Sequence, residues 1–474
     1  MSRKITIEPV TRIEGHGKVT IKLDDKGNVD AANLHITQVR GFEKFCEGRL
    51  FWEMPIITQR ICGICPVSHH LASSKAGDAI MGVQLTDTAK KLRKLIHMAQ
   101  LVQSHALHFF YLASPELVFG FDADPAIRNV VGVISKIPDI AVKGVKIRSF
   151  GQRIIEAMGD KRVHPTASIP GGMTRAFSEA HRHEFLKEID EVIANCELAM
   201  TLVKDYCTKH PEIIQKFASF PSGYLGLIDD QGNIEYYDGK LRMKDKNGNI
   251  VEDKLEPKDY LSIISEKVED WSYLKFPYYK KIGYPDGMYR VGPLGRINVA
   301  ESCSTPLANK EMAEFKQIVN NGVAEGSMFY HYARLIEMLN CAEEIKVLLT
   351  DEHITDTDFF TGSKIINREG VGVIEAPRGT LIHHYWVDPS GKLEKVNLIV
   401  STGHNNLAMN ASVLQVAREY IKDGKVTEGI LNRVEVAIRC YDPCLSCSSH
   451  ALGHMPLEIT IREVDGTVRE VLRN

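Results

Sequence analysis

The sequence predicts an α+β fold that is mainly α, with a core bundle of long helices and antiparallel β lobes at its periphery. Long stretches with apolar residues at helical spacing predict the bundle, and short alternating stretches with hairpin turns predict the lobes. Two Cys-x-x-Cys pairs, Cys62/Cys65 and Cys444/Cys447, stand near opposite ends of the chain. A chain of 474 residues can form one large core with lobes. We therefore expect a single large domain over residues 1–450.

The first 60 residues are expected to form an N-terminal β lobe. Three short stretches alternate apolar and polar side chains: residues 5–7, 18–23 and 33–39. The sequence at residues 24–28 is typical of a hairpin turn between the second and third stretches. We expect a small antiparallel sheet that carries Glu14 and Glu43 on its loops.

The helical bundle is expected over residues 87–217 and 305–350. Apolar residues recur at helical spacing from Asp87 to Glu116. Three further stretches are long and rich in Ala, Leu, Ile, Glu and Lys: residues 125–158, 176–217 and 308–350. Four long helices of this kind are typical of a bundle. The prolines of Ser114-Pro115 and Lys136-Ile-Pro138 predict breaks or kinks.

The remaining segments predict β structure and then a return to helix. Turn signals at hairpin spacing predict a β-rich insertion over residues 222–300. A C-terminal lobe is expected over residues 363–450. It should contain a hairpin and two helices that lead to the second cysteine pair: strands at 381–387 and 393–400, and helices at 405–422 and 427–440.

The composition argues against several classes of function. The net charge is −3, with 25% charged residues and no basic block, so nothing indicates nucleic-acid binding. The sequence has no run of about 18 apolar residues, and we expect no membrane span. The N-terminus lacks an apolar signal region. The ten cysteines are therefore expected in a reducing compartment, the cytoplasm.

Four cysteine thiolates are enough to bind a soft transition metal. A structural zinc site has its two pairs close together in sequence, whereas 378 residues separate Cys65 from Cys444. A shared site would form where the two chain ends meet, which indicates a buried and chemically active metal centre. A structural four-cysteine metal protein stays open as an alternative. Radical enzymes that bind S-adenosylmethionine use the spacing of Cys440, Cys444 and Cys447, but no βα repeat accompanies it here.

Four separated motifs occur in order along the chain. They are Val10-Thr-Arg-Ile-Glu-Gly-His16, Arg40-Gly-Phe-Glu43, Arg60-Ile-Cys-Gly-Ile-Cys-Pro-Val-Ser-His69 and Asp442-Pro-Cys-Leu-Ser-Cys-Ser-Ser-His450. Together they resemble the large subunit of nickel–iron hydrogenases, and the resemblance runs from Ile7 to the last residue. It implies the fold of that protein and an enzyme that cleaves H2 reversibly into protons and electrons.

The resemblance also implies the ligands of the metal centre. Cys62 and Cys444 would bind nickel terminally, while Cys65 and Cys447 would bridge nickel to an iron that carries carbon monoxide and cyanide. Arg378, in a Glu-Ala-Pro-Arg-Gly segment, would lie beside the cyanides, because a guanidinium group suits an anionic ligand.

Further residues acquire roles from the same resemblance. Glu14 would relay the proton that the Cys444 thiolate takes first. His69 would donate a hydrogen bond to a bridging sulfur. Glu43 and the imidazole of His450 would hold magnesium, together with water and a backbone carbonyl.

Electrons need a route out of this chain. No further cysteine cluster is available for an iron–sulfur centre, so we expect the partner to be an iron–sulfur small subunit. Residues 42–49 and 64–70 resemble the soluble bidirectional branch of the family, which implies flavin- and NAD-binding diaphorase subunits. An NADP-linked or sulfur-reducing hydrogenase is the alternative. The family also implies a maturation protease that removes the C-terminal extension, residues 451–474.

Overall fold

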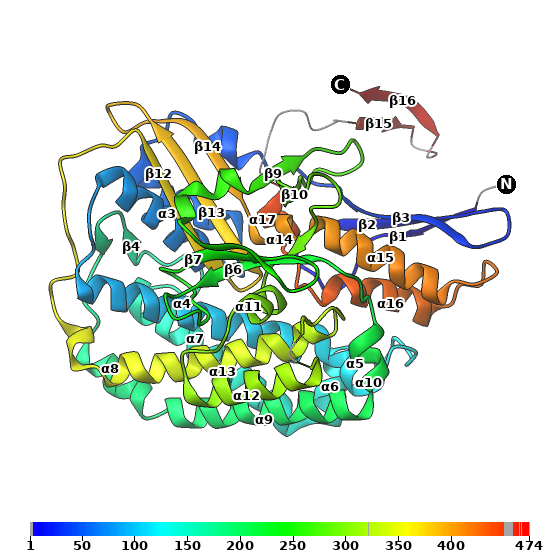
Figure 1. The fold of residues 1–474 in the computed structure, drawn as a ribbon, viewed down its shortest axis with the longest axis horizontal. Coiled ribbons are helices and arrows are strands. Elements are labelled where there is room, and N and C mark those ends of the chain that lie inside the picture. The colour runs from blue at the N-terminus through cyan, green and yellow to red at the C-terminus, as the bar shows by residue number, and fades with distance from the viewer. Residues whose placement is uncertain (1–2, 321, 450–457, 464, 466, 474) are drawn as a thin grey trace.

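The computed structural model describes residues 3–320, 322–449, 458–463, 465 and 467–473. Long helices lie together in one half of the molecule, and most β-strands lie in the other half (Figure 1). Buried apolar side chains from the N-terminal sheet, the long helices and the C-terminal segments join in one cluster. A second cluster lies between the central and C-terminal sheets. Among the described residues, no helix is long and apolar enough to cross a membrane.

The bundle is built around one buried helix, α13 (Phe329–Thr350), whose residues are buried on nearly all sides. A helix with this pattern belongs in the centre of a bundle. It packs against α4 and α9, and α4 packs against α7. The surrounding helices are α4 (Asp87–Leu107), α5 (Ser114–Phe119), α6 (Val130–Lys136), α7 (Pro138–Gly159), α8 (Glu179–Leu186), α9 (Ile189–Lys209), α10 (Pro211–Lys216) and α12 (Pro306–Ile318).

Ser114-Pro115 does not end the first long helix. The chain continues from α4 through a π-helical segment, His108–Ala113, into α5, where Pro115 occupies the first turn. Proline has no N–H to donate to the preceding turn. The Ser114 hydroxyl instead donates to the Phe110 carbonyl at 2.7 Å. The helix therefore changes its hydrogen-bond pattern at this site.

The other long helices are shorter than expected. Ile137 leaves the helical conformation before Pro138, as expected for a residue that precedes proline, and this predicted break is confirmed. A single helix over residues 176–217 is wrong, because α8, α9 and α10 are separate elements. The stretch at 308–350 is also divided, since α12 ends at Ile318 and α13 begins at Phe329.

The strands form separate small sheets. The N-terminal sheet has the order β1-β2-β3, the C-terminal sheet β12-β13-β14, and the central sheet β11-β6-β7-β8. All pairs in these sheets are antiparallel except β11 and β6, which run parallel, contrary to the antiparallel lobe expected there. Their bounds are β1 (Arg3–Ile7), β2 (Gly17–Leu23), β3 (Val29–Ile36), β6 (Gly223–Ile228), β7 (Lys240–Lys244), β8 (Ile250–Leu255), β11 (Tyr289–Arg290), β12 (Glu369–Ala376), β13 (Gly379–Val387) and β14 (Leu393–Ile399).

Smaller elements connect these parts. The short strands are β4 (Ser168–Ile169), β5 (Gly172–Met173), β9 (Ile264–Lys267) and β10 (Phe276–Tyr279), and the last hairpin is β15 (Glu458–Arg462) and β16 (Val468–Arg473). The remaining α-helices are α1 (Phe42–Cys46), α2 (Met54–Thr58), α3 (Pro66–Met81), α11 (Pro293–Val299), α14 (Ser401–His404), α15 (Asn406–Tyr420), α16 (Glu428–Arg439) and α17 (Leu445–Ser448). The 3-10 turns are η1 (Phe51–Glu53), η2 (Gln59–Ile61), η4 (Pro257–Ser262) and η5 (Glu352–Thr355).

Helix α3 packs unusually close to strand β12, and glycine makes this approach possible. A Cβ atom at Gly372 would lie 2.0 Å from the Ala72 carbonyl oxygen and 2.6 Å from the Ala76 nitrogen. Backbone atoms of a helix cannot move aside like the end of a flexible side chain. The contact fixes α3, which follows the first cysteine pair, against the C-terminal sheet.

We predict that Gly372→Ala destabilises the folded chain by about 1–3 kcal/mol, because the added methyl group overpacks a backbone contact. The midpoint of urea denaturation measures the loss. Gly362→Ala is the control, because a Cβ there meets only the Phe360 ring at 3.5 Å or beyond, and its effect should stay within about 0.5 kcal/mol. Equal stability of both variants would show that α3 is not fixed in this way.

Candidate metal centre

The four paired cysteines lie together in the interior. Cys62 follows η2, and Cys65 stands at the N-terminus of α3. Cys444 immediately precedes α17, and Cys447 lies within this helix. The Sγ atoms of Cys62 and Cys444 are 3.4 Å apart, and those of Cys65 and Cys447 are 3.6 Å apart. All four sulfurs fall within 4.8 Å of one another. The two ends of the chain therefore meet at one cluster of sulfur atoms.

The electrostatics of this cluster suit a cation. Hydrogen bonding from Cys444, and then from Cys447 and Cys65, lowers the pKa of Cys62. Burial raises the pKa of Cys444 and of Cys447. The Cys62 thiolate is thus stabilised by its neighbours, while burial opposes ionisation of the Cys444 and Cys447 thiols. Four buried thiolates require a metal ion to balance their charge, and a soft first-row transition metal fits this donor set.

A small cavity lies beside the cluster, and Cys65, Cys444, Cys447, His69 and Arg378 line it. Arg378 lies in the turn between β12 and β13. Burial alone would lower its pKa, but Asp442 and the cysteines raise it, so the guanidinium remains a cation.

The contacts of Arg378 with other described residues leave one of its N–H groups without a hydrogen-bond acceptor. Its Nε donates to the Asp442 carbonyl at 2.7 Å, and its Nη2 donates to Asp442 Oδ1 at 3.2 Å. Its Nη1 is buried without a hydrogen-bond partner among the described residues. A buried donor of this kind costs free energy unless it meets an acceptor. An anionic ligand in the cavity would satisfy it.

Glu14 approaches the second cysteine pair through both its backbone and its side chain. Its carbonyl accepts from the Leu445 N–H at 3.1 Å, in a parallel bridge with Cys444. Its Oε2 accepts from the Cys444 thiol at 3.0 Å and from the Ser446 N–H at 3.1 Å. A Cβ at the next residue, Gly15, would lie 2.8 Å from the Leu445 Cβ. Glycine at that position allows the close approach.

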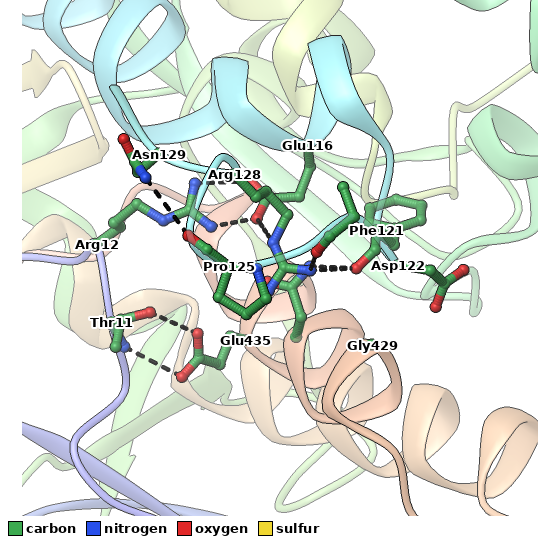
Figure 2. A network of polar contacts seen from close by, with 12 residues as sticks. Thr11, Arg12, Glu116, Phe121, Asp122, Pro125, Arg128, Asn129, Gly429 and Glu435 are labelled. Carbon is green, nitrogen blue, oxygen red and sulfur yellow. Dashed lines mark hydrogen bonds and ion pairs between the residues drawn. The ribbon is translucent and has the colours of Figure 1, made fainter. Parts of the chain in front are cut away.

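A network of polar contacts anchors the loop that carries Glu14 (Figure 2). Arg12 has a positive φ of 53°, and its guanidinium pairs with the Glu116 carboxylate through both terminal nitrogens. Glu116 is 3% exposed and also lies 3.3 Å from Arg439. Burial lowers the pKa of Arg439 to about 10, so this guanidinium still carries its charge near neutral pH.

Helix α16 holds the same loop from a second side. Glu435 accepts from the Thr11 N–H at 3.3 Å and from the Thr11 hydroxyl at 2.6 Å. Glu435 also pairs with Arg439 at 3.1 Å. Because α16 leads directly to the second cysteine pair, these contacts fix Glu14 relative to Cys444. Sequence reasoning missed this anchor, although Arg12 stands two residues before Glu14 within one motif.

Of the two expected magnesium ligands, the structure describes only Glu43. Glu43 lies on helix α1 rather than on a loop, which corrects the expectation. Its Oε1 accepts from the Leu398 N–H at 2.8 Å. His450 lies outside the described residues. The preceding residue, Ser449, accepts from the Arg40 N–H at 2.6 Å, so the described chain reaches the Arg40–Glu43 segment just before His450.

Two further sequence candidates are placed clearly. His69 Nδ1 lies 3.1 Å from His383 Nε2, and the bond from His69 to a bridging sulfur stays a prediction. The Cys440 sulfur lies 3.6 Å from Met328 Sδ and 3.6 Å from His331 Nε2. Among the described residues, the metal-binding group contains only the four paired cysteines. The three-cysteine arrangement of radical enzymes is therefore not formed.

Comparisons with known proteins agree with this geometry. A family model described as nickel-dependent hydrogenase matches residues 40–125 and 225–450, and a model described as HoxL-like matches residues 4–39. The beta subunit of the NAD-reducing hydrogenase HoxS of Cupriavidus necator is 45% identical, with 98% of each chain covered. A relative from Methanocaldococcus jannaschii, which belongs to the F420-non-reducing hydrogenase vhu, is 46% identical, covering 88% of this chain and 100% of its own length.

Solved structures extend the likeness to three dimensions. An NAD+-reducing NiFe-hydrogenase in the H2-reduced state superposes with a TM-score of 0.92 at 47% identity, covering 94% of this chain and 99% of the other. A NiFeSe-hydrogenase of Dm. baculatum has a TM-score of 0.75 at 23% identity, over 95% and 100% of the two chains, and shows the fold alone. The mainly helical α+β fold and the resemblance are thereby confirmed. The chain belongs to the nickel-dependent hydrogenase family, as a catalytic large subunit.

Proposed function

We propose that this hydrogenase subunit cleaves H2 reversibly at a nickel–iron centre and passes the electrons, through partner subunits, to NAD. The observation that carries the proposal is the buried cluster of four cysteine sulfurs with the Glu14 carboxylate 3.0 Å from Cys444. Cys62 and Cys444 would hold nickel terminally, and Cys65 and Cys447 would also hold iron. A bound nickel–iron pair would supply the two-electron chemistry of H2 cleavage.

The chain's own residues handle the proton. The Cys444 thiolate is the first acceptor, and Glu14 Oε2 takes the proton from its sulfur. The Ser446 N–H donates to the same carboxylate oxygen and keeps it directed at Cys444. Arg378 would bind the cyanide ligands of iron through its unsatisfied Nη1. His69 lines the same cavity and would donate a hydrogen bond to a bridging sulfur.

Magnesium would bind at Glu43 and His450, as a hard cation that prefers carboxylate oxygen and water. The contact between Arg40 and Ser449 supports this proposal, since it brings the chain that precedes His450 to the Glu43 segment.

Electrons would leave through an iron–sulfur small subunit, then through flavin- and NAD-binding diaphorase subunits. Burial raises the pKa of Cys46, Cys207 and Cys440 to about 12, and it also raises the pKa of Cys196, Cys303 and Cys341. Neutral, dispersed thiols of this kind do not suit an iron–sulfur cluster. NAD is proposed as the acceptor because the relative from Cupriavidus necator is an NAD-reducing hydrogenase. The ten free cysteines fit a cytoplasmic location.

An NADP-linked or sulfur-reducing enzyme is the second candidate. The alpha subunit of sulfhydrogenase 2 of Pyrococcus furiosus is 28% identical, well below the NAD-reducing relative. The purified complex with H2 should therefore reduce NAD much faster than NADP or sulfur.

Cys65→Ser and Cys447→Ser should each abolish nickel and iron binding, because each sulfur is expected to bridge both metals. Metal analysis should find about one nickel and one iron in the wild-type chain and neither in these variants. Cys207→Ala is the control and should keep both metals. Retained nickel, iron and hydrogen uptake in Cys65→Ser would contradict the assignment, and zinc alone in the wild-type chain would favour a structural metal site.

Glu14→Gln keeps the shape of the side chain but removes the proton acceptor. Turnover and H/D exchange should fall by about 10²–10⁴-fold, while the spectrum of the metal centre persists. Glu8→Gln is the matched control, because Glu8 is exposed. Exchange with solvent at the normal rate in Glu14→Gln would mean that the proton leaves by another route.

We also propose that a maturation protease removes residues 451–474. The last hairpin exposes Ile461, Val468 and Val471 at 36%, 50% and 44%, and it stands apart from the rest of the ribbon in Figure 1. Its loss would therefore uncover little of the core. The intact mass of the enzyme from its native host should correspond to a chain that ends at His450. An active, nickel-loaded chain that still ends at Asn474 would rule out trimming.

A further inference from the structure

Arg296, on helix α11, places its side chain between the helical bundle and the segment that carries Arg378. This arginine is fully buried. Glu337 on α13 binds it from the bundle, because Arg296 Nη2 donates to Glu337 Oε2 at 2.6 Å and Nε donates to Glu337 Oε1. Glu375 on β12 binds it from the other side, where Arg296 Nη1 donates to Glu375 Oε2 at 2.6 Å. One guanidinium group therefore joins α11, α13 and β12.

The same guanidinium also holds the backbone immediately before Arg378. Arg296 Nη1 donates to the Ala376 carbonyl at 3.0 Å, and Nη2 donates to the Pro377 carbonyl at 3.4 Å. A guanidinium group has five N–H donors and no acceptor. Each N–H of Arg296 meets one acceptor: three carboxylate oxygens and two backbone carbonyls. A lysine could not form this set, because an ammonium group has only three donors.

The charge of Arg296 does not by itself explain the two carbonyl contacts. Burial alone would lower the pKa of Arg296, but the carboxylates of Glu337 and Glu375 raise it, so the group remains a cation. A buried cation needs a charged partner, and these two carboxylates supply it. The bonds to the carbonyls instead fix the position of a backbone segment. Both carbonyls belong to residues that line the metal cavity beside Arg378.

Helix α11 also contacts the Arg378 turn through its own backbone. A Cβ atom at Gly292, directly before α11, would lie 2.8 Å from the Arg378 carbonyl oxygen. The next carbonyl, that of Gly379, accepts from Ser401 Oγ at 2.7 Å. The Arg378 side chain itself donates only to Asp442 among the described residues. Its direction therefore depends on where α11 holds its backbone.

We infer that Arg296 is a positioning residue that fixes the backbone of Ala376 and Pro377 and thereby directs the unsatisfied Nη1 of Arg378 at an anionic ligand of the metal centre. The inference rests on the proposed function, in which this ligand is cyanide on iron. Groups that orient the neighbours of a metal tune its properties, although they do not touch the metal. A residue of the bundle would in this way control the electronic state of the site.

Arg296→Lys tests the inference, because it keeps the positive charge but offers three N–H donors in place of five. The assembled enzyme should retain nickel and iron. The infrared bands of its cyanide ligands should move to lower wavenumber, because a cyanide nitrogen loses a hydrogen-bond donor when Arg378 turns away. Activity should fall roughly 10–100-fold.

Arg93→Lys is the matched control. Arg93 is also fully buried and pairs with Asp78. It likewise donates to two backbone carbonyls, those of Ile169 at 2.6 Å and Gly172 at 3.1 Å. This variant should be destabilised like the first one, as measured by its midpoint of urea denaturation. The cyanide bands should stay in place, because the segment that carries Arg378 is untouched.

Should Arg296→Lys fail to fold, Glu337→Gln is the second variant. It leaves Arg296 in place but replaces one of the two oxygens that orient the guanidinium group. The new amide nitrogen cannot accept a hydrogen bond, so the guanidinium must turn. The cyanide bands should move in the same direction as in Arg296→Lys, by a smaller amount.

Unchanged cyanide bands in the folded variant would overturn the inference, and so would an equal shift in Arg93→Lys. Failure of the proposed function looks different, since a wild-type chain that carries neither nickel nor iron would refute that function. A crystal structure of Arg296→Lys would still decide the inference, which requires Arg378 Nη1 to leave its wild-type position. An unmoved Arg378 in that structure would show that Arg296 does not position it.

Discussion

The bridge between Glu14 and Cys444 is the contact on which the rest of the site depends. It joins the first loop of the chain to the second cysteine pair through one backbone bond and two side-chain bonds. Without it, the Glu14 carboxylate and the Cys444 thiol would belong to separate parts of the molecule. The Arg12–Glu116 pair and the hydrogen bonds from Thr11 to Glu435 fix the loop that forms this bridge. The strained φ of Arg12 is tolerated because these contacts over-determine its position.

Buried ion pairs connect the helical bundle to the metal cavity. Arg296 on α11 pairs with Glu337 on α13 and with Glu375 on β12, and none of the three side chains is exposed. Glu375 stands three residues before Arg378, whose own charge is balanced by Asp442. Removing one member of such a pair leaves an unpaired buried charge, which is costly. The bundle therefore does more than enclose the site, since its charges fix the loop that carries Arg378.

Helix α3 has a double role. Glycines of β12 allow it to lie against the C-terminal sheet, and the same contact brings His69 and Ser73 to the polar side chains of β13. Cys65 stands at the start of this helix, so a shift of α3 would move this candidate metal ligand together with His69 and Ser73. Rigid elements that carry both ligands and their supporting groups hold a site more precisely than loops do.

The sequence by itself determined the class of the fold, the four cysteines and the motif that carries Glu14. Apolar periodicity reports helices and strands directly, and the cysteine motifs are short and local. Prediction from the sequence overestimated the length of the helices at residues 176–217 and 308–350. Helix propensity and apolar periodicity do not show where tertiary packing ends a helix. It also missed Glu116 and His383. A buried carboxylate or imidazole has no local signal, because its role depends on partners far away in the chain. Only the tertiary structure decided that Arg12 meets Glu116 and that His69 meets His383, since hydrogen bonds and ion pairs depend on distances that only the folded chain sets.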